Sequence, residues 1–152
     1  MSLPNIFTKE GTDKVIARIN QLTPTTQPQW GKMTVETMLA HCNVTYEMAY
    51  EDKHPKPNAL KKFILTLFVK GIVVSEAPYK HNSQTGPQFI ITEERSFEIE
   101  KQRLINYITK TQELGEASFE QKESMSFGKL SVAEWNNMYY KHLDHHLTQF
   151  GV

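Results

Sequence analysis

The sequence is poor in the features that mark disulfide-rich, nucleic-acid-binding and membrane-spanning proteins. Its 152 residues include a single cysteine, Cys42, which excludes an internal disulfide framework and agrees with a reducing, cytoplasmic location. Lysine and arginine together number 17, as do aspartate and glutamate, so the net charge is zero with histidine neutral. Because no basic stripe is present, nucleic acid is not expected as the main partner.

The chain also lacks an apolar run long enough to cross a membrane. Its most apolar stretch, residues 60–74, covers about 15 residues and contains three lysines, whereas a transmembrane helix needs about 20 apolar residues. The start of the chain, Met1-Ser2-Leu3-Pro4-Asn5, has neither the basic residues nor the long apolar stretch of a signal peptide. We therefore expect a cytoplasmic protein without a membrane partner, in which residues 60–74 form a buried helix.

Length and patterning predict one helical domain over residues 1–152. We expect Thr12 to cap a first helix that ends near Leu22, and Thr34 to cap a second helix. The apolar residues of the second helix recur at helical spacing. They are Val35, Met38, Leu39, Cys42, Tyr46 and Ala49.

The second half of the chain predicts two longer helices. One should run over residues 96–114 and end at Gly115, and the last should open with a capping box at residues 131–134, Ser-Val-Ala-Glu. Residues 75–92, rich in proline and glycine, predict a long irregular crossing with a short extended piece at 89–91. Long strands are not expected. The predicted fold is all-α, a four-helix bundle with an additional inserted helix.

The last helix carries the clearest candidate site. Three of the six histidines fall within residues 142–146, and His142 and His146 are four residues apart, so they are neighbours on one helix face. At about 100° per residue they lie roughly 80° and 40° from the centre of the apolar face, whereas His145 lies roughly 140° away. Buried imidazoles need partners, and metal coordination would supply them. A pair of ordinary surface histidines is the alternative.

A metal site needs more than two imidazoles, and His41 on the second helix is the candidate third ligand. It lies at the flank of that helix's apolar face, where it can reach a neighbouring helix. Cys42 lies at the middle of the same face and is expected to be a small buried residue. His145 is the weaker candidate ligand because it points elsewhere.

Other side chains in the chain have simpler interpretations. Tyr139 and Trp135 lie on the inner face of the last helix and are expected in the core, and Trp30 is expected as a packing anchor. Asp144 should point away from the histidine face into solvent. The two remaining histidines, His54 and His81, are expected on the surface.

Several motifs together resemble an uncharacterised bacterial family of the DinB-like (YfiT-like) superfamily of metal-binding four-helix bundles. They are Trp30-Gly31-Lys32-Met33-Thr34, Met38-Leu39-Ala40-His41, Phe127-Gly128, Glu134-Trp135 and residues 141–151. The resemblance implies that His41, His142 and His146 bind a divalent metal ion, with Gln149 in the place of a glutamine that commonly follows. One departure is Ser124-Met125-Ser126, which stands where the family often has His-Pro.

This resemblance implies a metal-dependent enzyme. Relatives in the superfamily include thiol-dependent transferases, so a low-molecular-weight thiol is the implied co-substrate. Zinc, nickel or iron is the expected metal, because imidazole suits all three. The sequence shows no general base and leaves the catalytic residues unknown. A metal-dependent hydrolase, or a non-catalytic protein that binds metal or holds an apolar ligand beneath residues 60–74, is the alternative. The substrate is a small molecule in either case, and a homodimer is left open.

Overall fold

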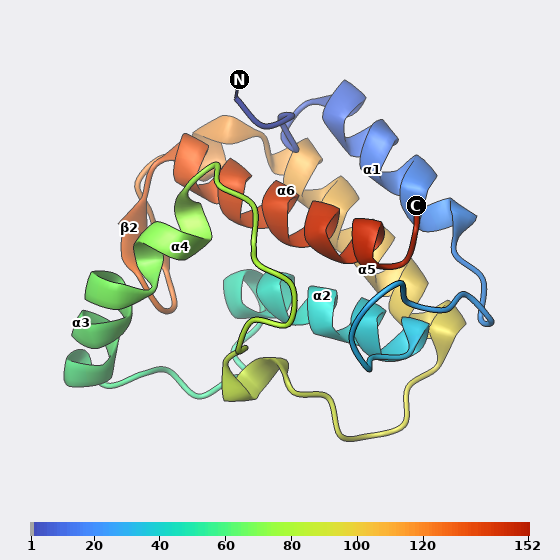
Figure 1. Ribbon diagram of the computed structural model, residues 1–152. Helices are drawn as coiled ribbons and strands as arrows, with labels where there is room; N and C mark the ends of the chain where they lie inside the picture. Colours follow the sequence, from blue (N-terminus) through green and yellow to red (C-terminus); the bar gives the residue numbers. More distant parts are fainter. Residues whose placement is uncertain (1) are drawn as a thin grey trace.

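The chain folds around four long helices joined by irregular segments, as a computed structural model that describes residues 2–152 shows (Figure 1). These helices are α1 (Lys9–Gln21), α2 (Val35–Tyr50), α5 (Phe97–Leu114) and α6 (Val132–Gln149). Two short helices, α3 (Ala59–Phe68) and α4 (Lys70–Val74), lie between α2 and α5. Two 3-10 turns, η1 (Pro87–Phe89) and η2 (Glu116–Ser118), complete the helical part. The expected all-α class is confirmed at this level.

The ends of the long helices follow their capping residues. The Thr34 hydroxyl accepts a hydrogen bond from the backbone of Thr37, and Ser131 with Glu134 forms the predicted capping box at the start of α6. Gly115, at φ 69°, ends α5 in the left-handed region that favours glycine. These boundaries agree with the sequence predictions.

The predicted start of α1 is wrong by one turn. Thr8, not Thr12, is the N-cap, and its hydroxyl accepts from the backbone N–H of Gly11. Thr12 lies inside the helix, buried, where its hydroxyl donates to the carbonyl of Ile6. Helix-compatible residues follow both threonines, so the local sequence could not show which of them caps the helix. The hydrogen bond from Thr12 to Ile6, which lies before the helix, occupies the Thr12 hydroxyl and leaves Thr8 as the cap.

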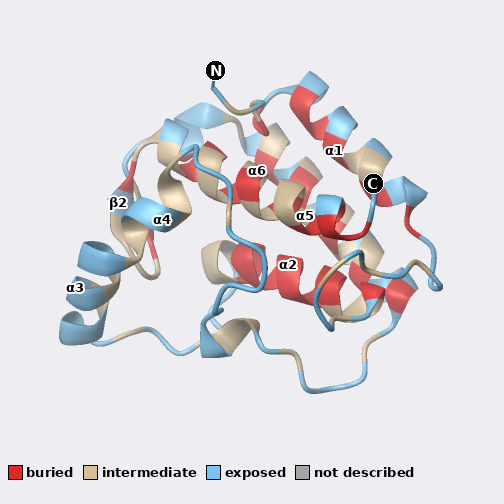
Figure 2. Cartoon of the chain, viewed as in Figure 1, coloured by how far each residue is buried: buried red, intermediate tan, exposed pale blue. Residues whose placement is uncertain are grey.

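The core lies among the four long helices. α1 and α2 each contact both α5 and α6, and in Figure 1 α6 runs between α1 above and α2 below. The inward faces of these helices are buried along their length (Figure 2). Large aromatic side chains fill the centre, among them Tyr46, Phe119, Trp135 and Tyr139. Trp135 and Tyr139 are thus core residues, as predicted from the wheel.

The expectation that residues 60–74 form a buried helix is wrong. The segment forms α3 and α4, which have no buried residue, and α3 stands at the edge of the molecule (Figures 1 and 2). Apolar composition predicts that a helix packs its apolar face against another surface, but it does not show whether that surface belongs to the same chain. Here the four long helices close the core without it.

The connection from α4 to α5 is irregular, as predicted, and crosses in front of α6 and α2 (Figure 1). Of the extended piece expected at 89–91, Phe89 is instead the end of the turn η1, in which its backbone N–H donates to the carbonyl of Gly86, whereas Ile90 has extended backbone. Pro87 at the first position of this turn favours the helical dihedral angle over an extended strand. The crossing is therefore bent where it meets α2.

A small antiparallel hairpin was not predicted. Strands β1 (Lys122–Ser124) and β2 (Gly128–Leu130) pair with Lys122 opposite Leu130. The Ser124 hydroxyl accepts from the backbone N–H of Phe127 and so closes the turn. Three-residue strands are too short for a visible alternation of polar and apolar residues. No helix within residues 2–152 has the length and apolar character needed to cross a membrane.

Candidate metal centre

Three histidines from two helices converge between α2 and α6. One nitrogen each of His41, His142 and His146 lies within 4.8 Å of the others, and the Nε2 atoms of His41 and His142 are 3.0 Å apart. His41 and His146 are 5% and 6% exposed, and His142 is half-buried. The structure thus brings together the three residues that were expected as ligands. Two nitrogen atoms bound to one tetrahedral zinc ion, each at about 2.0–2.1 Å, lie about 3.3–3.4 Å apart, a few tenths of an ångström more than this pair.

The other ring nitrogen of each histidine has an oxygen partner. Nδ1 of His41 is 2.9 Å from the carbonyl oxygen of Phe89, and Nδ1 of His146 is 2.8 Å from Oε1 of Gln149. Because both oxygens can only accept, these Nδ1 atoms carry the protons, and the Nε2 atoms keep their lone pairs. This is the outer-shell arrangement that fixes the tautomer of metal-binding histidines.

The hydrogen-bond partner of His142 can act as either a donor or an acceptor. Nδ1 of His142 is 2.9 Å from the hydroxyl oxygen of Thr45, which can donate or accept. When Thr45 donates, the Nε2–H of His142 can donate to His41. When Thr45 accepts, Nε2 of His142 is free to bind a cation. The hydroxyl therefore serves both tautomers of His142, and uptake of an ion would shift the ring proton from Nε2 to Nδ1 without net release of a proton.

All three imidazoles are held neutral at neutral pH. Burial lowers the pKa of His41 and lowers that of His142 well below its usual value, and the other histidines lower the pKa of His142 further. Burial, together with the neighbouring His41, lowers the pKa of His146 to about 3. A histidine that binds a metal must be neutral, so all three meet that requirement without losing a proton.

His145 is not a member of the three-histidine cluster, as its helix position predicts, although its ring packs edge-on against His146 with centroids 5.0 Å apart. It faces a hollow of about 130 Å³ that Trp30, Tyr79 and His81 also line. His81 is exposed, as expected, and its ring stacks on Trp30 with centroids 3.8 Å apart. Loop residues such as His81 and Tyr79 carry no periodic pattern that could have placed them there.

Two other expected surface residues make specific contacts. Asp144 points away from the cluster, as predicted, but forms an ion pair with Arg18 of α1 at 2.6 Å instead of standing in solvent alone. His54 is largely buried, and its Nε2 lies 2.7 Å from a carboxylate oxygen of Glu47. Both contacts link residues from separate elements, which local sequence does not reveal.

Cys42 adjoins His41 in sequence but belongs to the core. It is buried, its thiol donates to the sulfur of Met38, and burial raises the pKa of the thiol. A thiol in this state is a poor ligand and a poor nucleophile. The interpretation of Cys42 as a small buried residue is confirmed.

Two residues around the cluster were missed. Thr45 follows His41 by four residues, so helical spacing could have placed it on the same face of α2. Phe89 had no such signal, because its position depends on how the crossing bends; its ring also packs against His41 and His142. Gln149, three residues after His146, was indicated by the resemblance.

A mostly helical chain with a buried cluster of three neutral histidines is a candidate metal-binding protein. Comparison with models of known families, with curated proteins and with solved structures gave no match. The geometry of the cluster must therefore carry the functional argument.

Proposed function

We propose that the protein is a metal-dependent enzyme of the DinB-like class, with a divalent ion held by His41, His142 and His146. The observation that carries the proposal is the convergence of one ring nitrogen from each histidine, among them the Nε2 atoms of His41 and His142, while the Nδ1 atom of each ring has an oxygen partner. The arrangement of one histidine on the second long helix and a pair on the last supports the DinB-like assignment. So does the packing of α1 and α2 against α5 and α6.

The donor set fits a transition metal with an open position. Imidazole nitrogen suits zinc, nickel and iron. Catalytic zinc sites have three protein ligands and leave the fourth position to water or substrate, whereas structural sites are closed by four. Among residues 2–152, the cluster consists of the three histidines, with no fourth histidine, cysteine, aspartate or glutamate beside them. This supports a metal site with an open coordination position.

The charge of the site favours an anionic ligand. A divalent ion lowers the pKa of a thiol or a water molecule bound to it. His41, His142 and His146 are neutral and leave the ion's charge uncompensated, which favours a thiolate. Cys42 cannot supply it because its thiol is buried against Met38. We therefore propose a low-molecular-weight thiol as co-substrate and transfer of its sulfur to a small electrophile.

Hydrolysis or metal binding without catalysis is the second candidate. The partners of the three imidazoles are a carbonyl, a hydroxyl and an amide, none of which is an effective general base. A site of this kind can hold an ion without accelerating a reaction. The experiments below separate these alternatives.

The first test is metal loading. Elemental analysis of the purified protein should find about one divalent ion per chain, and His41→Ala, His142→Ala or His146→Ala should each abolish loading. His145→Ala is the matched control, since it removes a histidine from the same turn of α6 that contributes no nitrogen to the cluster, and it should load normally. Loss of the ion in His145→Ala but not in His146→Ala would contradict the assignment.

The second test is the response to thiols. In protein substituted with cobalt, added bacillithiol or glutathione should change the visible spectrum as sulfur enters the coordination shell. Conjugation of the thiol to a small electrophile should require all three histidines, because a site that acts as a unit fails when any member is removed. An unchanged spectrum with turnover of esters or amides would indicate a hydrolase, and no turnover at all a binding protein.

A further inference from the structure

The outward face of α3 and α4 is apolar and uncovered. Six large side chains on it, between 46% and 69% exposed, are Leu60, Phe63, Ile64, Leu67, Phe68 and Ile72. We refer to these six residues as the arm face. None of the ten residues of α3 is buried. A helix that presents large apolar side chains to its surroundings normally packs against another surface.

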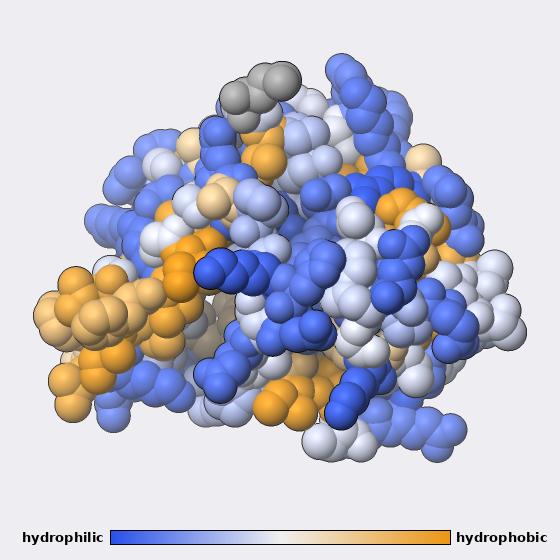
Figure 3. Space-filling model, in the orientation of Figure 1, coloured by the Kyte–Doolittle hydropathy of each residue, from blue (hydrophilic) through white to orange (hydrophobic). Residues whose placement is uncertain are grey.

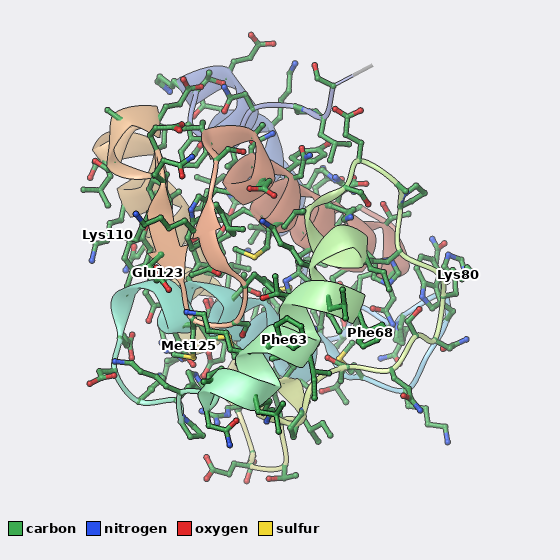
Figure 4. All side chains as sticks on the ribbon, turned by 90° about the vertical axis from the view of Figure 1, so that its left-hand side faces the viewer. Phe63, Phe68, Lys80, Lys110, Glu123 and Met125 are labelled. Carbon is green, nitrogen blue, oxygen red and sulfur yellow. The ribbon has the colours of Figure 1, made fainter. Side chains whose placement is uncertain are left out.

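The arm face is continuous. At about 100° per residue, the five members on α3 cover an arc of about 140°, while Lys62 and Leu65 point the other way, toward the body. Those two residues are half-buried, in agreement with this orientation. Figure 3 shows apolar residues gathered at the α3 edge of the molecule, and Figure 4 shows Phe63 and Phe68 on the side that faces away from the long helices.

The size of the arm face matches a subunit interface. Six aromatic and aliphatic side chains at these exposures present on the order of 700 Å², given 150–250 Å² for a whole aromatic side chain. The largest apolar patch of a typical monomer is about 300–600 Å². Each partner in a standard protein interface buries about 800 Å². The arm face is thus larger than a monomer usually leaves uncovered and close to what a stable dimer needs.

Its charge is nearly neutral, which favours a second copy over an anionic lipid surface. Lys70 pairs with Glu134 at 2.9 Å, and Lys62 pairs with Glu123 of the hairpin. Of the three lysines in residues 59–74, only Lys61 forms no ion pair with another described residue. Peripheral membrane helices border their apolar face with free basic residues, and those are largely neutralised here by the protein itself. Two such faces can approach each other without strong repulsion between like charges.

We propose that the arm face pairs with the arm face of a second copy of this chain across a two-fold axis, with the two α3 helices antiparallel. Such an interface uses the same patch on both subunits, so each apolar side chain is covered by its counterpart. It would also stabilise α3, which at ten residues is too short to be stable on its own and has little support from the body. The proposal does not depend on the metal site.

Light scattering coupled to size-exclusion chromatography tests the proposal. The protein should have twice the mass of the 17.6 kDa chain, and Phe63→Glu combined with Leu67→Glu should reduce it to one chain. The matched control is Ile99→Glu on α5, which changes a residue of similar exposure outside the arm face and should remain a dimer. Circular dichroism should show that each variant keeps its helical content.

Disulfide trapping provides a second measurement that needs no disruptive change. Ile64 lies near the middle of α3, so Ile64→Cys should form a dimer linked through this residue on mild oxidation, whereas Ile99→Cys should not. Cys42 is buried and should not interfere. A wild-type monomer at all concentrations would overturn the proposal. If that monomer bound phosphatidylglycerol vesicles through the arm face, the partner would be a lipid surface instead. A dimer lost in Ile99→Glu but kept in the α3 variant would place the interface elsewhere.

Discussion

At the scale of single residues, the proposed metal binding depends on the nitrogen atoms that face away from the cluster. An imidazole presents a lone pair at Nε2 only when its proton is at Nδ1, and the carbonyl of Phe89 and the amide of Gln149 hold the proton there. Gln149 is itself held, because its Nε2 donates to the carbonyl of Trp30. The loop before α2 therefore helps to orient His146, although it contributes no ligand.

We predict that Thr45→Val weakens metal binding about 10- to 100-fold without abolishing it. Valine keeps the shape of threonine but removes the hydroxyl that accepts from Nδ1 of His142, so this ring loses its fixed orientation. A competition titration with a metal indicator measures the effect. Thr148→Val is the control, since its exposed hydroxyl on α6 contacts Arg18 and no histidine. Equal affinities in the two variants would show that Thr45 does not orient the ring.

At the scale of elements, a polar network fixes how α2 is placed against α5. Asn43 donates to the Glu100 carboxylate at 2.8 Å, and Arg103 links Glu100 to Glu47 of α2. Burial would raise the pKa of Glu47, but hydrogen bonds from Lys53, Arg103 and His54 outweigh it and lower the pKa. Buried carboxylates tolerate few arrangements of their partners. The network therefore restricts rotation of α2, which carries His41.

Two helical glycines give opposite predictions for the same substitution. In Gly11→Ala, the added Cβ on α1 would lie 1.9 Å from the carbonyl oxygen of Asn5, so the substitution should destabilise the fold by about 1–3 kcal/mol. In Gly71→Ala, the added Cβ on α4 meets nothing within 4 Å, so stability should rise by up to about 1 kcal/mol. Urea unfolding measures both changes. Similar effects from the two substitutions would mean that Asn5 does not pack closely on α1.

The elements that sequence predicted well are those with local determinants. The capping box of α6, the Thr34 cap of α2 and Gly115 after α5 each act within a few residues. The failures have tertiary causes. The start of α1 depends on a bond from Thr12 to Ile6, and the exposure of α3 depends on how the other helices close the core.

The same distinction applies to the candidate site. The pairing of His142 with His146 follows from helical spacing alone, whereas His41 is 101 residues from His142 in the chain. Periodicity placed His41 at the flank of its helix and allowed it as a third ligand, and the resemblance assigned it to the same site as the other two. Phe89 could not be found at all, because its carbonyl reaches His41 through an irregular segment that has no pattern.

At the scale of the whole molecule, the cluster joins α2 and α6, which are otherwise held together by packing. A ligand that binds only the folded state stabilises it by RT ln(1 + [L]/Kd), about 2.7 kcal/mol at 100 times the dissociation constant. The unfolded chain cannot offer three preformed imidazoles from such distant positions, so most of this free energy should stabilise the fold.

We therefore predict that saturating metal raises the melting temperature by about 5–10 °C, given about 2–4 °C per kcal/mol for a chain of this length. Differential scanning calorimetry of loaded and chelator-treated protein measures the shift. His146→Ala should melt at the same temperature with and without chelator, because it lacks the site, while His145→Ala should keep the full shift. If the melting curve stays the same after the loss of metal has been verified, the ion does not bind between α2 and α6.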